Sequence, residues 1–335
     1  MRILQVIPGL RKAAGTTTFV EQVVRELRAL GHEVVIVRHE SELSAADIVH
    51  IHGMWSPLLH RASVFARRRH IPVVWSTHGM TAPWSMRHKW WKKLPAWWLY
   101  QRRDLKAAQL IHCTTDLETE WNRQLGLSRC LVAPLGTEMP PTVVPLKTLN
   151  DRPLQVLFVG RIYPVKGLAN VVRAAALLQA KGEGPVAFRI VGPDQAGHLA
   201  ELQRLAAELQ VESMFTWAGP KFGAELASEY DGCDVLILPS FTENFGGVVA
   251  DALAHGRSVI ASRFTPWQVL EQKHCGWWTD NAPESLAAAL ALARAMPDAE
   301  RAAMGERGRA LVAERFAWPQ IARMLVAGYE REVTR

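Results

Sequence analysis

The sequence predicts an α/β protein built of two doubly wound domains. Three observations lead to this prediction: a length of 335 residues, a repeated alternation of short apolar runs with amphipathic segments, and one proline-rich interruption. At ~100–200 residues per domain the length suggests two domains, and the alternation favours parallel sheets that are covered on both faces. Because ligands bind beyond the carboxyl ends of the strands in such sheets, the two Rossmann-like domains are expected to face each other across a cleft.

The first expected domain opens with a strand, a helix and a second strand. A β-branched run at residues 3–7 precedes residues 17–30, where apolar side chains recur at helical spacing until Gly31 ends the pattern. Residues 33–37 form the second apolar run, and the alternation then repeats. Further strands are expected at residues 47–51, 72–76, 110–113 and 130–133, and a further helix at residues 97–108.

Prolines interrupt the chain between residues 138 and 153, where no regular element fits. We therefore expect a domain of residues 1–140, a linker of residues 141–152, a domain of residues 153–316 and a helix of residues 317–335 that crosses back to the first domain. Strands of the second domain are expected at residues 156–159, 187–191, 215–218, 235–239 and 258–262, and helices at residues 168–180, 199–209 and 248–255.

The composition argues against a disordered chain and against a membrane-spanning one. Hydrophobic residues make up 49% and charged residues 21%, which is ordinary for a globular protein, and no stretch reaches ~18 consecutive apolar residues. The first residues read as a strand rather than as a secretory signal, and four widely spaced cysteines favour reduced thiols in a cytosolic protein. A formal net charge of +7 favours anionic partners, which include phosphorylated small molecules, nucleic acid and acidic membranes.

The turn after the first strand, residues 8–16, contains neither the GxGxxG pattern of dinucleotide-binding proteins nor the P-loop pattern. Gly15 and Thr16 lie where a helix begins, so free backbone amides there can bind an anion. The alternative is a plain connecting turn.

Two turns of the second domain carry charged side chains. Arg161 and Lys166 follow its first strand and suit a diphosphate, although a solvated loop would carry them equally well. A later turn is more specific, because Glu243 and Asp251 can accept hydrogen bonds from hydroxyl groups while glycines let phosphate approach the amides of a helix start. Phosphate and polyol recognition at one turn implies a sugar nucleotide. The backbone of this turn comes from Asn244, Phe245, Gly246, Gly247 and Val248.

These residues resemble the retaining glycosyltransferases of family 4, which adopt the two-domain GT-B fold. The resemblance rests on the pattern Gly-Arg-x4-Lys-Gly at residues 160–167 and on the pattern Glu-x7-acid at residues 243–251, and it extends over most of the chain. It implies an acceptor-side first domain and a second domain that binds a nucleotide-sugar donor.

The resemblance also implies roles for single residues. Arg161 and Lys166 would hold the donor diphosphate, Glu243 the transferred sugar, and Asp251, which stands where the family usually has Glu, the nucleotide ribose. His78 would reach the reacting sugar. His52 also lies at a strand end, where it would serve either the site or simple packing.

The implied reaction is a retaining sugar transfer that uses no cofactor and no metal, and the sequence contains no Asp-x-Asp pattern. The implied acceptor is a carbohydrate, expected to be a lipid-linked glycan of bacterial lipopolysaccharide, O-antigen or exopolysaccharide assembly. The alternatives are a sugar-nucleotide epimerase or hydrolase on the same fold and a catalytically silent sugar-binding protein.

Residues 83–103 hold five of the 13 tryptophans and six lysines or arginines. Interleaved aromatic and cationic side chains suit a membrane interface, whereas stacking on sugar rings and a helix core that includes Trp97, Trp98 and Tyr100 are the alternatives. Nucleic acid is not expected as a partner, since no known nucleic-acid module accompanies the segment. We expect a cytoplasmic protein, with peripheral attachment to the inner face of the cytoplasmic membrane left open. The residues assigned to a membrane or acceptor surface are Trp84, Trp90, Trp91, Lys92 and Lys93.

Overall fold

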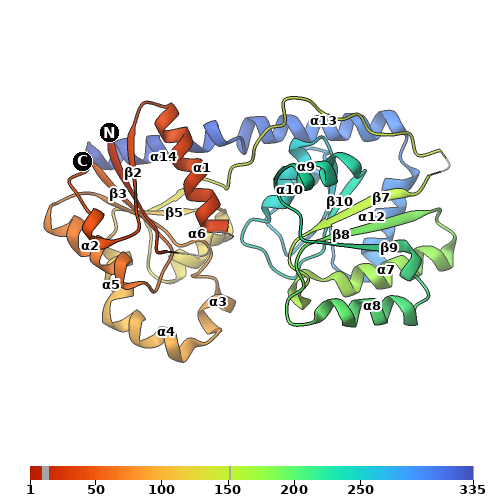
Figure 1. The fold of residues 1–335 in the computed structure, drawn as a ribbon, viewed down its shortest axis with the longest axis horizontal. Helices are drawn as coiled ribbons and strands as arrows, with labels where there is room; N and C mark the ends of the chain where they lie inside the picture. Colours follow the sequence, from red (N-terminus) through yellow and green to blue (C-terminus); the bar gives the residue numbers. More distant parts are fainter. Residues whose placement is uncertain (10–14, 151, 335) are drawn as a thin grey trace. The chain divides into compact units, whose positions relative to one another are not determined.

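The computed structural model describes residues 1–9, 15–150 and 152–334 and divides into two compact units (Figure 1). The first unit comprises Met1–Gly136 and Trp318–Arg335, and the second comprises Thr137–Ala317. Each unit contains one six-stranded parallel sheet, so the predicted α/β class is confirmed. Residues 10–14 of the expected anion-binding turn and Asp151 of the expected linker lie outside the described residues.

The first sheet has the strand order β2-β1-β3-β4-β5-β6. Its strands are short. The four inner strands are almost wholly buried, because helices cover both faces and the strands carry apolar side chains on both sides, whereas the edge strands β2 and β6 are partly exposed. They span Arg2–Val6 (β1), Glu33–Val37 (β2), Ile48–His52 (β3), Val73–Ser76 (β4), Leu110–Cys113 (β5) and Cys130–Val132 (β6).

Two helices that lie far apart in the sequence cover one face of this sheet together. Helix α1 (Gly15–Ala29) buries an apolar stripe at helical spacing, and helix α14 (Trp318–Val333) packs beside it. The stripe of α14 includes Ile321, Leu325 and Tyr329, all fully buried. The remaining helices of the first unit are α2 (Pro57–Arg68), α3 (Pro83–Arg87), α4 (Trp90–Ala96), α5 (Arg102–Ala107) and α6 (Asp116–Gln124).

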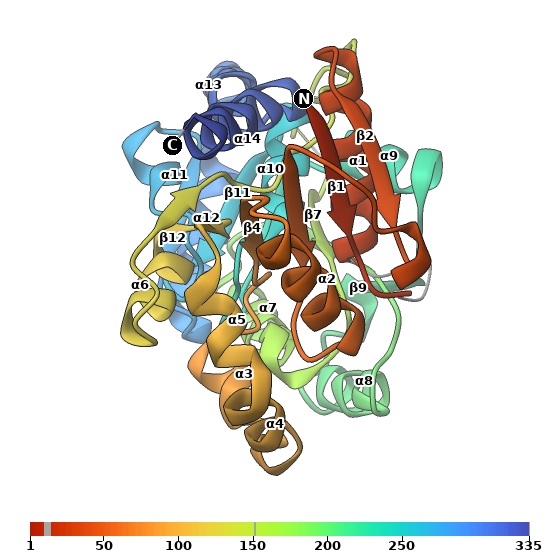
Figure 2. The same ribbon diagram turned by 90° about the vertical axis from the view of Figure 1, so that its left-hand side faces the viewer.

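Helices α3 and α4 extend from one end of the first unit in both views (Figures 1 and 2). A π-helical turn, Trp97–Gln101, follows α4 and leads into α5, so the single helix expected at residues 97–108 is not present as such. Pro95 lies inside α4 and removes one backbone donor, and π-helical turns occur where the regular ladder of hydrogen bonds is interrupted.

The second sheet has the strand order β12-β11-β10-β7-β8-β9. The order reverses between β7 and β10, which are neighbours, and ligands of doubly wound sheets bind at such a switch point. The strands span Leu154–Val159 (β7), Val186–Val191 (β8), Phe215–Gly219 (β9), Val235–Leu238 (β10), Ser258–Ser262 (β11) and Gly276–Thr279 (β12).

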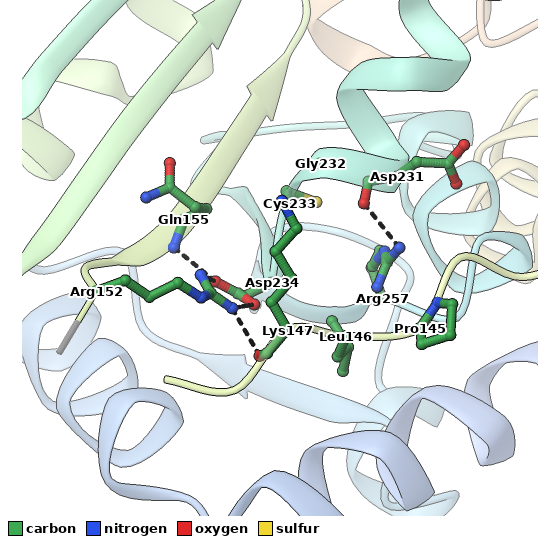
Figure 3. Close-up of a pocket in the computed structure, with 10 residues that line it drawn as sticks. All are labelled: Pro145, Leu146, Lys147, Arg152, Gln155, Asp231, Gly232, Cys233, Asp234 and Arg257. Carbon is green, nitrogen blue, oxygen red and sulfur yellow. Dashed lines mark hydrogen bonds and ion pairs between the residues drawn. The ribbon is translucent and has the colours of Figure 1, made fainter. Parts of the chain in front are cut away.

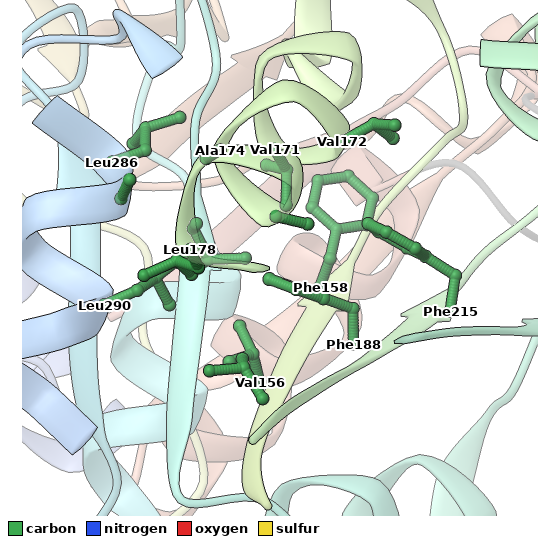
Figure 4. Close-up of a cluster of buried hydrophobic side chains, with 14 of the residues drawn as sticks. Val156, Phe158, Val171, Val172, Ala174, Leu178, Phe188, Phe215, Leu286 and Leu290 are labelled. Atoms are coloured by element: carbon green, nitrogen blue, oxygen red, sulfur yellow. The ribbon is translucent and has the colours of Figure 1, made fainter. Parts of the chain in front are cut away.

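The core of the second unit lies where two helices meet one face of this sheet (Figure 4). Helices α7 (Leu168–Lys181) and α12 (Pro283–Ala295) pack together, and Leu178 and Leu290 are both buried in this cluster. On the other face, α10 (Gly247–Ala254) contacts α13 (Asp298–Arg315). The second unit also contains α8 (His198–Glu208), α9 (Gly223–Gly232), α11 (Val269–Gln272) and the single 3-10 turns Pro164–Lys166 and Glu212–Met214. The first unit contains one further 3-10 turn among the described residues, Glu40–Glu42.

The proline-rich segment is anchored at the amino edge of the second sheet (Figure 3). Arg152 donates two hydrogen bonds of 2.7 Å to the carboxylate of Asp234, and Arg301 donates a third of 3.0 Å. Arg257 donates to the backbone carbonyl of Val144 at 2.8 Å. A cavity of about 290 Å³ remains between these residues. It lies at the edge of the sheet opposite to the strand ends where a ligand is expected.

Candidate functional site

Two loops at the carboxyl edge of the second sheet meet in an ion pair. Lys166 ends the 3-10 turn after β7, and its ammonium pairs with Oε1 of Glu243, which lies on the loop after β10. The hydroxyl of Ser240 donates to the same oxygen at 2.8 Å. Both charged side chains are largely buried, with exposed fractions of 16% and 13%, so water screens the pair only weakly.

Backbone contacts hold these two loops against each other. The amide of Phe241 donates to the carbonyl of Val165 at 2.8 Å. Gly167 has φ = 71°, and a β-carbon at this position would overlap the carbonyl oxygen of Pro239. Glycine is therefore needed directly after Lys166, because no other residue allows this close approach.

The helix start beside the ion pair is built on a second glycine. Gly246 has φ = 76° and caps α10, and a β-carbon there would lie 2.9 Å from Leu238. The side chain of Phe245 is buried, and its carbonyl accepts a hydrogen bond of 2.5 Å from the indole of Trp267. A β-carbon on Gly247 would meet no atom within 4 Å, so there is open space beside the start of α10, and a helix start suits an anion.

The structure does not bring Arg161 to the ion pair. Its side chain is exposed and donates to Gln195 at 2.9 Å. The assignment of Arg161 to the donor diphosphate stays a prediction, as do the backbone roles expected for Asn244 and Val248, which are half-buried beside Gly246.

Asp251 lies on α10, is half-buried and reaches Thr137, the first residue of the second unit. Its carboxylate accepts a hydrogen bond from the hydroxyl of Thr137. Burial raises the pKa of Asp251, although the hydrogen bond from Thr137 and the charge of His255 oppose this effect. The contact of Asp251 with a ribose stays a prediction.

In the first unit, His78 follows β4 at the carboxyl edge of the sheet and has φ = 50°. Its Nε2 lies 3.1 Å from Nδ1 of His52, and its ring contacts the edge of Phe19 at a centroid distance of 5.4 Å. Burial lowers the pKa of His78 to about 4, so the imidazole is neutral at pH 7. Helix α1 begins at Gly15, and Thr16 is half-buried in its first turn.

Glu118 is a functional candidate that the sequence reasoning missed. Its Oε1 accepts from the hydroxyl of Thr77 at 2.7 Å and from the amide of Gly79 at 2.6 Å, which are the two neighbours of His78. Burial opposes ionisation of Glu118, yet hydrogen bonds from Thr114, Thr77 and Gly79 outweigh it and lower its pKa. The available signal was the pattern Thr-x-x-Glu at Thr115, where the hydroxyl caps α6.

The segment with many tryptophans is largely exposed. Trp84, Trp90 and Trp91 have exposed fractions of 63%, 56% and 59%. Trp98 is 65% exposed, so the interpretation of this side chain as helix core is wrong, whereas Trp97 is half-buried and packs on Trp55. Lys92 is exposed, but Lys93 is half-buried and donates to the carbonyl of Ser85 at 2.5 Å.

Within the described ranges, no three His, Cys, Asp or Glu side chains are grouped as a metal ion would require. Among the helices that the structure describes, none combines the length and apolar character needed to cross a bilayer.

Two family profiles match the chain. The family described as glycosyl transferases group 1 matches residues 146–311, and the family described as glycosyltransferase family 4 matches residues 38–138. A D-inositol 3-phosphate glycosyltransferase of Salinispora tropica is 31% identical over 194 residues, which are 55% of this chain and 40% of that relative. The chain therefore spans less than half of the length of the curated relatives that it matches.

Solved structures match the fold over nearly the whole chain. Sucrose-phosphate synthase from Thermosynechococcus elongatus has a TM-score of 0.74 at 18% identity, covering 98% of both chains. The Anabaena protein HepE in complex with UDP and glucose has a TM-score of 0.73 at 16% identity, covering 99% of this chain and 100% of that one. With two parallel six-stranded sheets, the expected GT-B fold is confirmed.

Proposed function

Because this chain belongs to the glycosyl transferases group 1 family, we propose that it is a retaining glycosyltransferase that moves a sugar from a nucleotide diphosphate to a carbohydrate acceptor. We assign donor binding to the second unit and acceptor recognition to the first. The observation that carries the proposal is the ion pair of Lys166 and Glu243 at the switch point of the second sheet.

In the proposed reaction the bond between C1 of the sugar and the phosphate oxygen breaks. A bond from C1 to the acceptor oxygen forms on the same face of the sugar, and the acceptor proton passes to the leaving phosphate. Lys166, Arg161 and the start of α10 would balance the charge on the leaving diphosphate, so no divalent metal is required. Glu243 would accept hydrogen bonds from hydroxyls of the transferred sugar, and Asp251 from the ribose.

The donor we propose is a UDP-sugar, because the HepE protein, which shares this fold, was solved in complex with UDP and glucose. A thermal-shift screen of UDP-, GDP-, ADP- and dTDP-sugars tests this choice. A ligand at 100 times its dissociation constant stabilises the native state by about 2.7 kcal/mol. A stabilising UDP-sugar is the expected result, and the absence of any stabilising sugar nucleotide would contradict donor binding.

For the acceptor we propose a lipid-linked glycan, such as an intermediate of bacterial lipopolysaccharide, O-antigen or exopolysaccharide assembly. The support is the exposed aromatic and cationic surface of Trp84, Trp90, Trp91 and Lys92, which suits attachment to an anionic bilayer.

A soluble inositol phosphate is the second candidate acceptor, because the curated relatives are named as D-inositol 3-phosphate glycosyltransferases. Incubation of the stabilising donor with each acceptor class, followed by mass spectrometry of the product, separates the two. Release of free sugar or of an epimer without acceptor would instead favour a hydrolase or an epimerase.

A further inference from the structure

Three side chains on neighbouring strands form a row of hydrogen bonds that ends at His78. Gln5 lies on β1, His52 ends β3, and His78 follows β4, which is the order of these strands in the sheet. Oε1 of Gln5 lies 2.5 Å from Nε2 of His52, and Nδ1 of His52 lies 3.1 Å from Nε2 of His78. Gln5 and His52 are fully buried, so water does not compete for these bonds.

The chemistry of the groups gives this row a direction. An amide oxygen only accepts, so Nε2 of His52 must carry the proton that bonds to Gln5. A neutral imidazole has one N–H, which leaves Nδ1 of His52 as an acceptor for Nε2–H of His78. Burial lowers the pKa of both histidines, which keeps them neutral. Nδ1 of His78 is then left without a proton.

A second row of hydrogen bonds runs beside the first and ends at Tyr329. The carbonyl of Ala133 only accepts, so His112 donates to it at 2.7 Å, and each earlier bond must point the same way. Ser76 then donates to His112, His50 donates to Ser76, and the hydroxyl of Tyr329 donates to His50, each at 2.6 Å.

Tyr329 therefore uses its one hydroxyl proton in the hydrogen bond to His50. Burial raises the pKa of this hydroxyl. The orientation of the Gln5 amide is given by its own contact, in which Oε1 faces Nε2 of His52.

The turn that carries His78 is held on both sides. Glu118 binds the hydroxyl of Thr77 and the amide of Gly79, while its other oxygen accepts from the amide and the hydroxyl of Thr114, each at 2.8 Å. His78 itself is in the left-handed region, which a non-glycine residue adopts only where its surroundings require it. On this fixed backbone, the contact with Nδ1 of His52 places Nε2 of the ring.

We propose that Gln5, acting through His52, sets the tautomer of His78 so that Nδ1 is offered as a hydrogen-bond acceptor to a hydroxyl of the substrate. Within the part of the chain that the structure describes, Nδ1 of His78 has no hydrogen-bond partner, and the side chain is half-exposed. Gln5 and His52 are positioning residues in this account. The proposal rests on the proposed function only for the identity of the hydroxyl, which would belong to a sugar.

The tautomer is measured directly by long-range ¹H–¹⁵N correlation spectra of the uniformly labelled full chain at pH 7.5. Loss of signals in His78→Gln assigns the ring. The expected wild-type spectrum is that of an imidazole protonated at Nε2, and protonation at Nδ1 would overturn the proposal without the need for any variant of Gln5.

Gln5→Met removes the acceptor at similar volume, so we expect the His78 signals to become those of mixed tautomers. Ser76→Ala is the matched control, because it breaks the second row and costs stability while leaving the bonds of Gln5 and His52 in place. An unchanged His78 tautomer in Gln5→Met, or an equal change in Ser76→Ala, would argue that the row does not set the tautomer.

UDP-glucose is the probe for the hydroxyl. We expect it to shift the Nδ1 resonance of His78, and the KM for UDP-glucose in Gln5→Met to rise about fivefold with little change in kcat, as for one lost neutral hydrogen bond. If UDP-glucose stabilises the chain but leaves Nδ1 unshifted, the contact with a substrate hydroxyl is wrong. If no sugar nucleotide stabilises the chain, the proposed function fails, whereas the tautomer measured in the free chain still stands.

Discussion

The hydroxyl of Tyr329 lies 2.6 Å from Nδ1 of His50 and ties helix α14 to strand β3 across 279 residues of sequence. Next to this bond lies a buried region that contains the imidazoles of His50, His52 and His112, and the half-buried His78 borders it. Burial lowers the pKa of all four, two of them well below the usual value, and the neighbouring imidazoles add to this effect at His50 and His52. The first unit is therefore built to hold these rings uncharged.

We predict that the first unit loses stability as the pH falls from about 6.5 towards 4. The unfolded chain binds a proton at His78 near pH 6.5, while the folded chain does so at about 4, so acid in this window favours unfolding. The groups that act on His78 are Glu118, which raises its pKa, and His112, which lowers it. Calorimetry between pH 7.5 and pH 4.5 measures the effect as a falling Tm.

His70→Gln is the control for this experiment, since His70 is exposed and lies outside the buried region. It should retain the full dependence on pH, whereas His78→Gln should reduce it. A Tm for the first unit that stays constant down to pH 5 would contradict the prediction.

Loss of either partner of the Lys166 and Glu243 pair is expected to reduce sugar transfer by about 10²–10³-fold, as for other groups that stabilise charge in a transition state. Lys166→Met and Glu243→Gln keep the volume of each side chain. Each leaves a largely buried partner unpaired, so a loss of about 1–3 kcal/mol in unfolding free energy is expected with the fold retained.

Glu229→Gln is the matched control, because Glu229 forms an ion pair with Arg189, with a bond of 2.8 Å, elsewhere in the second unit. Transfer should continue at the wild-type rate in this variant. Near-wild-type turnover in both Lys166→Met and Glu243→Gln would remove the basis of the proposed site.

Alanine substitutions at the neighbouring residues Gly246 and Gly247 are expected to differ in their effect on stability. Alanine at Gly246 must adopt φ = 76° and press on Leu238, so we expect a loss of about 1–2 kcal/mol. Alanine at Gly247 meets no atom within 4 Å and should change stability by less than about 0.5 kcal/mol. Urea unfolding of the two variants compares them directly. Equal losses would show that the backbone at Gly246 is not under this constraint.

Asp251→Asn separates stability from donor binding. The asparagine keeps an acceptor for Thr137 and removes a charge that burial disfavours. Because the pKa of Asp251 is raised in the folded chain, ionisation of this carboxyl lowers the stability as the pH rises above the usual pKa of 3.8. Asp251→Asn should therefore be at least as stable as the wild type at pH 7.5. If Asp251 holds the ribose, donor affinity should fall about tenfold, as for one hydrogen bond to a charged group. Isothermal titration calorimetry with unchanged affinity would exclude that role.

The exposed aromatic surface is tested with Trp90→Ser, Trp91→Ser and Lys92→Glu combined. We expect affinity for vesicles of phosphatidylcholine and phosphatidylglycerol to fall at least about tenfold, since indoles and cations both bind such surfaces. Lys93 is left unchanged, because its ammonium already bonds to the carbonyl of Ser85.

The control for the vesicle experiment combines Phe222→Ser with Lys221→Glu, which removes an exposed aromatic side chain and a lysine from the second unit. Sedimentation of this control should equal that of the wild type. If the triple variant sediments like the wild type as well, the surface does not serve membrane attachment.

Most strands could be predicted closely because short β-branched runs between turns have few other interpretations, although β12 (Gly276–Thr279) was not among the expected strands. The expected bounds of Leu110–Cys113 and Ser258–Ser262 agree with those of β5 and β11. Helix α12 could not be predicted in the same way, because its alanines and leucines surround the helix and leave no distinct polar face.

The candidate site of the second unit was visible in sequence because its residues lie in two short motifs. The groups that hold His78 in place could not be predicted, since Gln5 contacts His52 and Glu118 contacts Thr77 through strand pairing and helix placement that no local pattern encodes. A glutamine within the apolar run of β1 was the one local sign, as buried polar side chains require a partner.

Helix α14 also bears on how the chain folds during synthesis. The second unit begins at Thr137 and ends at Ala317, two residues that form a single parallel β-bridge, so it is inserted within the first. A ribosome completes all of this insertion before α14 emerges, and until then the apolar face that Ile321 and Leu325 cover remains open. The first unit, although its sheet is made first, is the last to finish folding.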